Sequence, residues 1–116
     1  MMRLVLNALL LLLLGCTHLV LESTERLQIR NLSDSAIRNF SVAGRSDTLV
    51  WIPEEVAPGD LSYVHERDFV GSFHIVFEAK SGGRWIPVEL GKVRFDGGSE
   101  LAKISRKDSI WVLDFE

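Results

Sequence analysis

Histidine, cysteine, serine and the acidic residues are the side chains that could bind a metal or attack a substrate. A zinc site needs three or four converging ligands, usually with at least one pair at short spacing. His65 and His74 fall on different expected strands, and His18 lies near the N-terminus. Neither an H-x-x-x-H pattern nor a second cysteine is present. We therefore expect no metal site, and no feature of the sequence indicates a cofactor.

Nucleophilic catalysis would need a serine activated by a histidine that an acidic residue orients. Ser62, His65 and Asp68 form a local group of suitable types. However, Ser62 and His65 lie three positions apart in an expected strand and should point to opposite faces. No G-x-S-x-G elbow is present, and the paired glycines do not form a phosphate-binding loop. The sequence predicts a protein that is not an enzyme and has no catalytic residues.

Three residues are the best candidates for contact with a protein partner. Tryptophan is enriched in binding hot spots, and Trp85 has the opposite parity to its apolar neighbours, so we expect it to face outward. Glu54 and Glu55 lie in a proline-bounded loop, residues 53–60, where side chains are solvated by default. We take Trp85, Glu54 and Glu55 as candidate partner-binding residues.

A short apolar stretch precedes the single cysteine. Cys16 has no second cysteine with which to form a disulfide within the chain. Residues 4–14 follow one cation, Arg3, and their length suits the core of a signal peptide, roughly 7–15 residues. A membrane-spanning helix needs about 20 apolar residues. Extension to residue 21 would include several polar residues, so a retained membrane anchor is the alternative.

The sequence Leu13-Leu14-Gly15-Cys16 resembles the lipobox of bacterial lipoproteins, whose cysteine is lipidated and becomes the first residue of the mature protein. The resemblance implies cleavage after Gly15 and acyl chains on Cys16, and two or more such chains give stable anchoring. In the proteobacterial sorting scheme an aspartate after the cysteine retains the protein in the inner membrane. Thr17 therefore implies the outer membrane, with the domain on the periplasmic side.

The resemblance divides the chain into a signal peptide (1–15), a lipidated cysteine with a short polar tether (16–25), and one domain (26–116). A domain of about 100 residues can bury one core without disulfides. The chain has 13 Lys and Arg against 16 Asp and Glu. This balance argues against a nucleic-acid partner, which needs a basic face, and against a polybasic membrane patch.

The domain sequence predicts β-structure almost throughout. Runs of β-branched and aromatic residues recur at about ten-residue intervals between turn formers, which is typical of a sandwich or barrel. Ser81-Gly82-Gly83 is the clearest hairpin signal, because glycine accepts the positive φ of tight hairpins. The expected strands cover residues 26–31, 36–43, 48–52, 61–65, 71–80, 84–95, 100–106 and 109–115.

Alternation of side chains places the apolar residues of each strand on one face. In the 84–95 strand, Gly91 is expected to form a bulge that returns Val93 to the side of Leu90. Trp51 and Trp111 are expected in the core. We predict an all-β, immunoglobulin-like two-sheet sandwich of seven or eight antiparallel strands. A small closed β-barrel is the alternative.

These features favour a lipid-anchored, periplasm-facing module that binds a protein or has a structural role in an envelope assembly. The sheet edges or the loop at residues 53–60 would supply the contact. The alternative is an inhibitor or immunity-type lipoprotein that neutralises a hydrolase such as lysozyme. A third hypothesis is a small hydrolase or a ligand carrier. A carrier would need an apolar cavity of a few hundred Å³.

Overall fold

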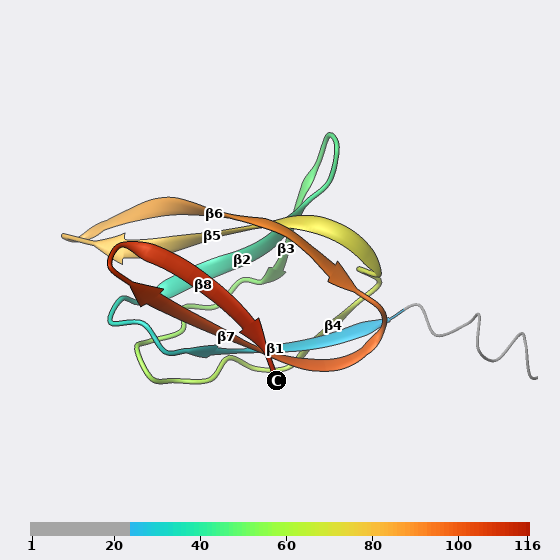
Figure 1. Ribbon diagram of the computed structural model, residues 1–116, viewed down its shortest axis with the longest axis horizontal. Helices are drawn as coiled ribbons and strands as arrows, with labels where there is room; N and C mark the ends of the chain where they lie inside the picture. Colours follow the sequence, from blue (N-terminus) through green and yellow to red (C-terminus); the bar gives the residue numbers. More distant parts are fainter. Residues whose placement is uncertain (1–23) are drawn as a thin grey trace, which may run out of the picture.

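The computed structural model describes residues 24–116, which form two four-stranded sheets that pack together. Figure 1 shows the sheets, with strand orders β4-β1-β7-β8 and β3-β2-β5-β6, as two layers. The prediction of an all-β chain with two sheets, rather than one closed sheet, is confirmed. The strands are β1 (Glu25–Asn31), β2 (Ile37–Ala43), β3 (Thr48–Ile52), β4 (His65–Arg67), β5 (Gly71–Ser81), β6 (Arg84–Phe95), β7 (Gly98–Lys107) and β8 (Ile110–Phe115).

All the predicted strands except the fourth lie where the sequence indicated, within one or two residues at their ends. The fourth prediction, 61–65, is wrong in position, because β4 covers His65–Arg67 and Leu61 makes only an isolated bridge with Arg30. The residues before β4 follow the sheet edge without forming a continuous ladder. In the part of the chain that the structure describes, no helix is long and apolar enough to cross a membrane.

One strand pairing corrects the prediction of an all-antiparallel sandwich. β1 and β7 run parallel, in a register from Glu25 opposite Gly98 to Asn31 opposite Ile104, whereas the other strand pairs are antiparallel. The alternation of apolar and polar side chains shows which face of a strand is buried, but it is the same whether neighbouring strands run parallel or antiparallel. Parallel neighbours need a long crossover, and here the whole second sheet lies between β1 and β7 in the sequence.

The core lies between the sheets and is rich in aromatic rings. Trp51, fully buried, packs edge-on against Phe69 and Phe95, with ring centroids 5.1 and 5.0 Å away. Trp111 is partly buried and packs edge-on against Phe77 at 5.2 Å. Both tryptophans predicted for the core therefore contribute to it. Edge-to-face pairs of this kind contribute about 0.5–1.5 kcal/mol beyond the area that they bury.

Glycines set the geometry of the β5–β6 hairpin as the sequence predicts. Gly82 and Gly83 form its turn with φ angles of 56° and 79°. Lys92 pairs with His74 and Leu90 with Ile75, which leaves Gly91 without a partner in the register. The predicted bulge is therefore confirmed, and Leu90 and Val93 both pack against the core.

Candidate functional site

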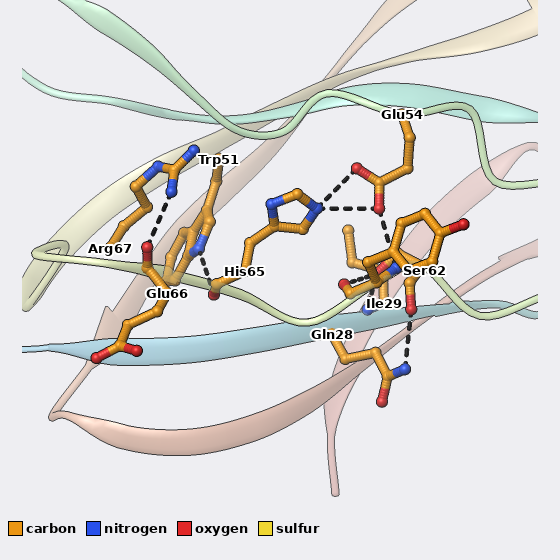
Figure 2. Close-up of polar contacts among 9 residues, drawn as sticks. Gln28, Ile29, Trp51, Glu54, Ser62, His65, Glu66 and Arg67 are labelled. Carbon is orange, nitrogen blue, oxygen red and sulfur yellow. Dashed lines mark hydrogen bonds and ion pairs between the residues drawn. The ribbon is translucent and has the colours of Figure 1, made fainter.

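The densest group of polar contacts holds the segment between β3 and β4, residues 53–64, which we call the connecting loop. Figure 2 shows Glu54 and Ser62 of this loop near His65, the first residue of β4, with Gln28 and Ile29 of β1 beneath them. Loops on a rigid scaffold carry binding residues more often than the scaffold does. We therefore describe this group as the candidate site.

Glu54 joins the beginning of the connecting loop to its end. His65 Nε2 lies 2.8 and 3.0 Å from the two carboxylate oxygens of Glu54, and the Tyr63 amide donates to Oε2 at 2.9 Å. Burial raises the pKa of Glu54, but hydrogen bonds from His65 and from the backbone amides of Glu54 and Tyr63 outweigh it, so the pKa is lowered overall. Glu54 is thus held as a carboxylate that fixes the backbone at Tyr63.

Ser62 attaches the same part of the loop to β1. Its Oγ accepts a hydrogen bond from the Ile29 amide at 2.8 Å and donates to the Tyr63 carbonyl at 2.8 Å. Its own amide donates to the Ile29 carbonyl at 2.8 Å, and Gln28 Nε2 donates to its carbonyl at 2.8 Å. Because the Ser62 hydroxyl is buried and donates to a backbone carbonyl, it does not serve as a nucleophile in this arrangement. His65 contacts Glu54 instead.

Asn31, at the end of β1, holds the first half of the connecting loop. Its fully buried side-chain amide donates to the Ser35 carbonyl at 2.7 Å and to the Val56 carbonyl at 2.9 Å. Its backbone amide donates to the Asp60 carbonyl at 3.0 Å, and its carbonyl accepts from Gly59 at 2.6 Å. The loop is thus fixed to the sandwich by contacts along most of its length.

The fixed loop presents three apolar side chains to solvent. Leu61, Tyr63 and Val64 are 47%, 78% and 58% exposed. Next to Val64, a shallow hollow of about 280 Å³ lies over β1 and β7 and is also lined by Arg26, Gln28, Ser99, Glu100 and Leu101. A rigid backbone with exposed aromatic and aliphatic side chains beside a hollow is suited to binding a protein surface.

The structure does not bring the predicted site residues together. Glu54 is only 24% exposed and is engaged within the loop, which differs from the solvated state expected for it, whereas Glu55 is exposed. Trp85 lies on β6, on the other sheet. Cys16 lies outside the described residues. Sequence analysis missed Tyr63 and its apolar neighbours as surface residues, although they follow a Pro-Gly turn without regular alternation.

Trp85 takes part in a polar cluster on the solvent-facing side of its sheet. The Arg38 guanidinium lies over its ring, 4.1 Å from the centroid. Arg38 Nε and Asn39 Nδ2 also contact Glu78 Oε1, at 3.3 and 2.6 Å. These contacts, Asn39 first and Arg38 second, lower the pKa of Glu78. Trp85 is therefore half-covered by its own chain.

The first testable prediction concerns Trp85. Because its ring lies outside the core and stacks on a partly exposed arginine, Trp85→Ala should lower the free energy of unfolding by about 1 kcal/mol or less. Urea unfolding followed by circular dichroism measures this change. A loss above about 3 kcal/mol, the amount typical of a core tryptophan, would contradict the placement.

The second prediction concerns Glu54. Glu54→Gln should weaken the contacts to His65 and Tyr63 and cost about 1–2 kcal/mol, because both are hydrogen bonds to a charged, partly buried group. The Tyr63 amide should then exchange its proton with solvent faster. Since the pKa of Glu54 is lowered, its contribution is present above the unfolded value of 4.5 and is lost as the pH falls through the folded value.

Hydrogen exchange measured by NMR tests this prediction. Glu55→Gln is the matched control, because Glu55 is the exposed neighbour. Equal exchange rates for the Tyr63 amide in both variants would show that the Glu54 carboxylate does not hold the loop.

In residues 24–116, no three His, Cys, Asp or Glu side chains lie close enough together to hold a metal ion. Comparison with protein-family models and with curated proteins gives no match to this chain.

Proposed function

We propose that this chain is a bacterial lipoprotein anchored through acyl chains on Cys16 to the periplasmic side of the outer membrane. We further propose that its domain, an immunoglobulin-like sandwich, is a non-enzymatic module that binds another envelope protein. The resemblance of Leu13-Leu14-Gly15-Cys16 to a lipobox supports the anchor. The connecting loop supports the binding function.

The observation that carries the binding function is the exposure of Leu61, Tyr63 and Val64 on a backbone fixed by Glu54, Ser62 and His65. A surface that is ordered before binding loses less conformational entropy when the partner arrives. Tyrosine supplies a large apolar contact and a polar tip, and it is among the residues enriched in binding hot spots. Glu54 is therefore a positioning residue in this proposal, and Tyr63 is the contact.

Strand addition at a sheet edge is a different way of binding, and the edge strands differ in how well they suit it. β6 contains Pro87 and the bulge at Gly91, which are features that protect an edge. β4 has only three residues. β8 contains neither proline nor glycine, and its Ile110 is 66% exposed. The fourth edge strand, β3, also lacks proline and glycine and exposes Leu49 and Val50, but it has only five residues. The six-residue β8 therefore offers a partner strand the longest unprotected edge.

Site-specific photo-crosslinking in native membranes tests the proposal. A photoreactive phenylalanine analogue at Tyr63 should give a discrete protein adduct. The same analogue at Ile86, which is 47% exposed on the other sheet, should give none. An adduct at Ile110 without one at Tyr63 would show that the partner binds β8 and would contradict the loop as the contact. Absence of an adduct at Tyr63 and Ile110 would contradict the binding function.

A hydrolase inhibitor is the second candidate, and the same fixed loop favours it, since a rigid exposed loop can enter an enzyme cleft. The purified chain would then block a muramidase at a stoichiometric ratio. Tyr63→Ala should remove the inhibition while leaving the fold intact, because Tyr63 is 78% exposed. If a molar excess of the chain did not inhibit the muramidase, this candidate would be eliminated.

A further inference from the structure

A second hollow lies on the solvent-facing side of the β3-β2-β5-β6 sheet, where the β2–β3 hairpin rises from the body of the sandwich (Figure 1). Its volume is about 280 Å³. We call it the basic pocket, and it is lined by Ala43, Gly44, Arg45, Ser72, His74 and Lys92.

Cationic and hydrogen-bonding side chains converge on the basic pocket without an acidic residue among them. Lys92 lies directly opposite His74 in the β5–β6 pairing, and Arg45 comes from the hairpin. Among the described residues, no carboxylate oxygen lies within 4.0 Å of the side-chain nitrogens of these three residues. By contrast, the nearby Arg94 is paired with Asp96 at 2.7 Å.

The basic pocket holds two cations with no acidic partner. The Lys92 ammonium and the Arg45 guanidinium line the same hollow and repel one another. A bound anion would replace that repulsion with charge-assisted hydrogen bonds. The donors available are the Lys92 ammonium, the Arg45 guanidinium, the Ser72 hydroxyl and the His74 ring N–H.

We propose that the basic pocket binds a phosphate group. Three cationic or ring N–H donors and a hydroxyl match the several acceptor oxygens of a phosphate. The volume of about 280 Å³ is just below the usual range of ligand pockets, about 300–1,000 Å³, which fits a small phosphorylated group such as the headgroup of a phospholipid.

The position of the pocket favours the phospholipid headgroup as the source of that phosphate. Gly71 at the start of β5 pairs with Phe95 at the end of β6. Three residues later in the chain, Gly98 pairs with Glu25 at the start of β1. Ser72, His74 and Lys92 therefore lie in the half of the sandwich where the chain enters β1. If residues 16–24 connect this end to acyl chains, as the proposed function has it, the pocket lies near the bilayer surface. The phosphate chemistry itself does not depend on that anchor.

The first arm of the test uses phosphate in solution. Full-length protein in neutral detergent is titrated with glycerol phosphate, and chloride at equal ionic strength is the control. Lys92→Gln should weaken binding about tenfold, whereas Lys107→Gln, at the exposed far turn, should leave it unchanged. This arm needs no anchor and no protein partner, so its failure is distinguishable from failure of the proposed function.

The second arm uses phosphatidylglycerol vesicles that contain the full-length protein and lipids with brominated chains. A fluorophore on the hairpin, at Ser46, should be quenched, and one at Ser81 in the β5–β6 turn should not. Reversal of the quenching by Lys92→Gln identifies the lipid headgroup as the ligand. Saturable binding in the first arm alone identifies a soluble phosphate. The proposal would be overturned if the first arm gave no saturable binding and the second arm gave no quenching that depends on Lys92.

Discussion

Glu25→Gln should raise the free energy of unfolding by roughly 2–3 kcal/mol at about pH 8 and change it little at about pH 4. Glu25 is the first residue of β1 and is fully buried. Neither of its carboxylate oxygens, nor Oε2 of Glu100, has a hydrogen-bond partner among the described residues that would compensate for a buried charge. Glutamine keeps the shape of this side chain and removes the charge.

The sign of the effect follows from the pKa of Glu25. Burial is the largest cause that raises this pKa, and the nearby Glu100 carboxyl is the next, so that it reaches about 7 from an ordinary value of 4.5. The Gly97 backbone lowers it in part, and the charge of Asp96 raises it slightly. The folded protein therefore keeps a proton that the unfolded chain releases. The contribution of Glu25 to stability is fully present below 4.5 and is lost as the pH rises through about 7.

Urea unfolding at several pH values tests this prediction. Glu66→Gln is the matched control, because Glu66 is an exposed glutamate of the neighbouring strand β4. Glu100→Gln should give part of the same gain, since it removes the second carboxyl. A Glu25→Gln variant whose gain over the wild type is the same at about pH 4 and about pH 8 would show that Glu25 is not a buried acid.

Trp51→Ala should lower the free energy of unfolding by about 3–5 kcal/mol. The indole is fully buried against Phe69 and Phe95, and its Nε1 donates to the His65 carbonyl at 3.1 Å. The substitution would remove both the core packing and a bond between β3 and β4. A loss of this size is a large part of the 5–15 kcal/mol total of an ordinary domain.

Trp51→Phe separates the two contributions. Phenylalanine keeps an aromatic ring in the core and cannot donate to His65, so its smaller loss reports the hydrogen bond and part of the packing. The free energies come from urea unfolding. A loss below about 1 kcal/mol for Trp51→Ala would contradict its place at the centre of the core.

Local features of the fold could be predicted from the sequence, because neighbouring residues determine them. The glycines at 82 and 83 allow the hairpin turn, and Gly91 allows the bulge that keeps Leu90 and Val93 on one face. Strand direction was not predictable in the same way. The parallel pairing of β1 and β7 joins segments from opposite ends of the domain, and alternation is the same for both directions.

The candidate site depends on contacts between distant residues, which a single sequence does not reveal. Ser62 contacts Ile29, which lies 33 residues earlier. The sequence predicts a solvated loop residue at Glu54 and a strand residue at His65, and nothing in it indicates that the two side chains are in contact. The polar tether predicted from the sequence includes Glu25, yet the inward parity that Glu25 shares with Leu27 places it in the sandwich. The alternation of apolar and polar residues therefore predicts burial least well where a polar residue occupies an inward position.

The mass of the intact protein, purified from native membranes, tests the anchored-module account most directly. We predict a chain that begins at Cys16 and carries a diacylglycerol and an amide-linked acyl chain. A chain that retains residues 1–15 with a free thiol would contradict the anchor, and with it the position of the connecting loop in the envelope.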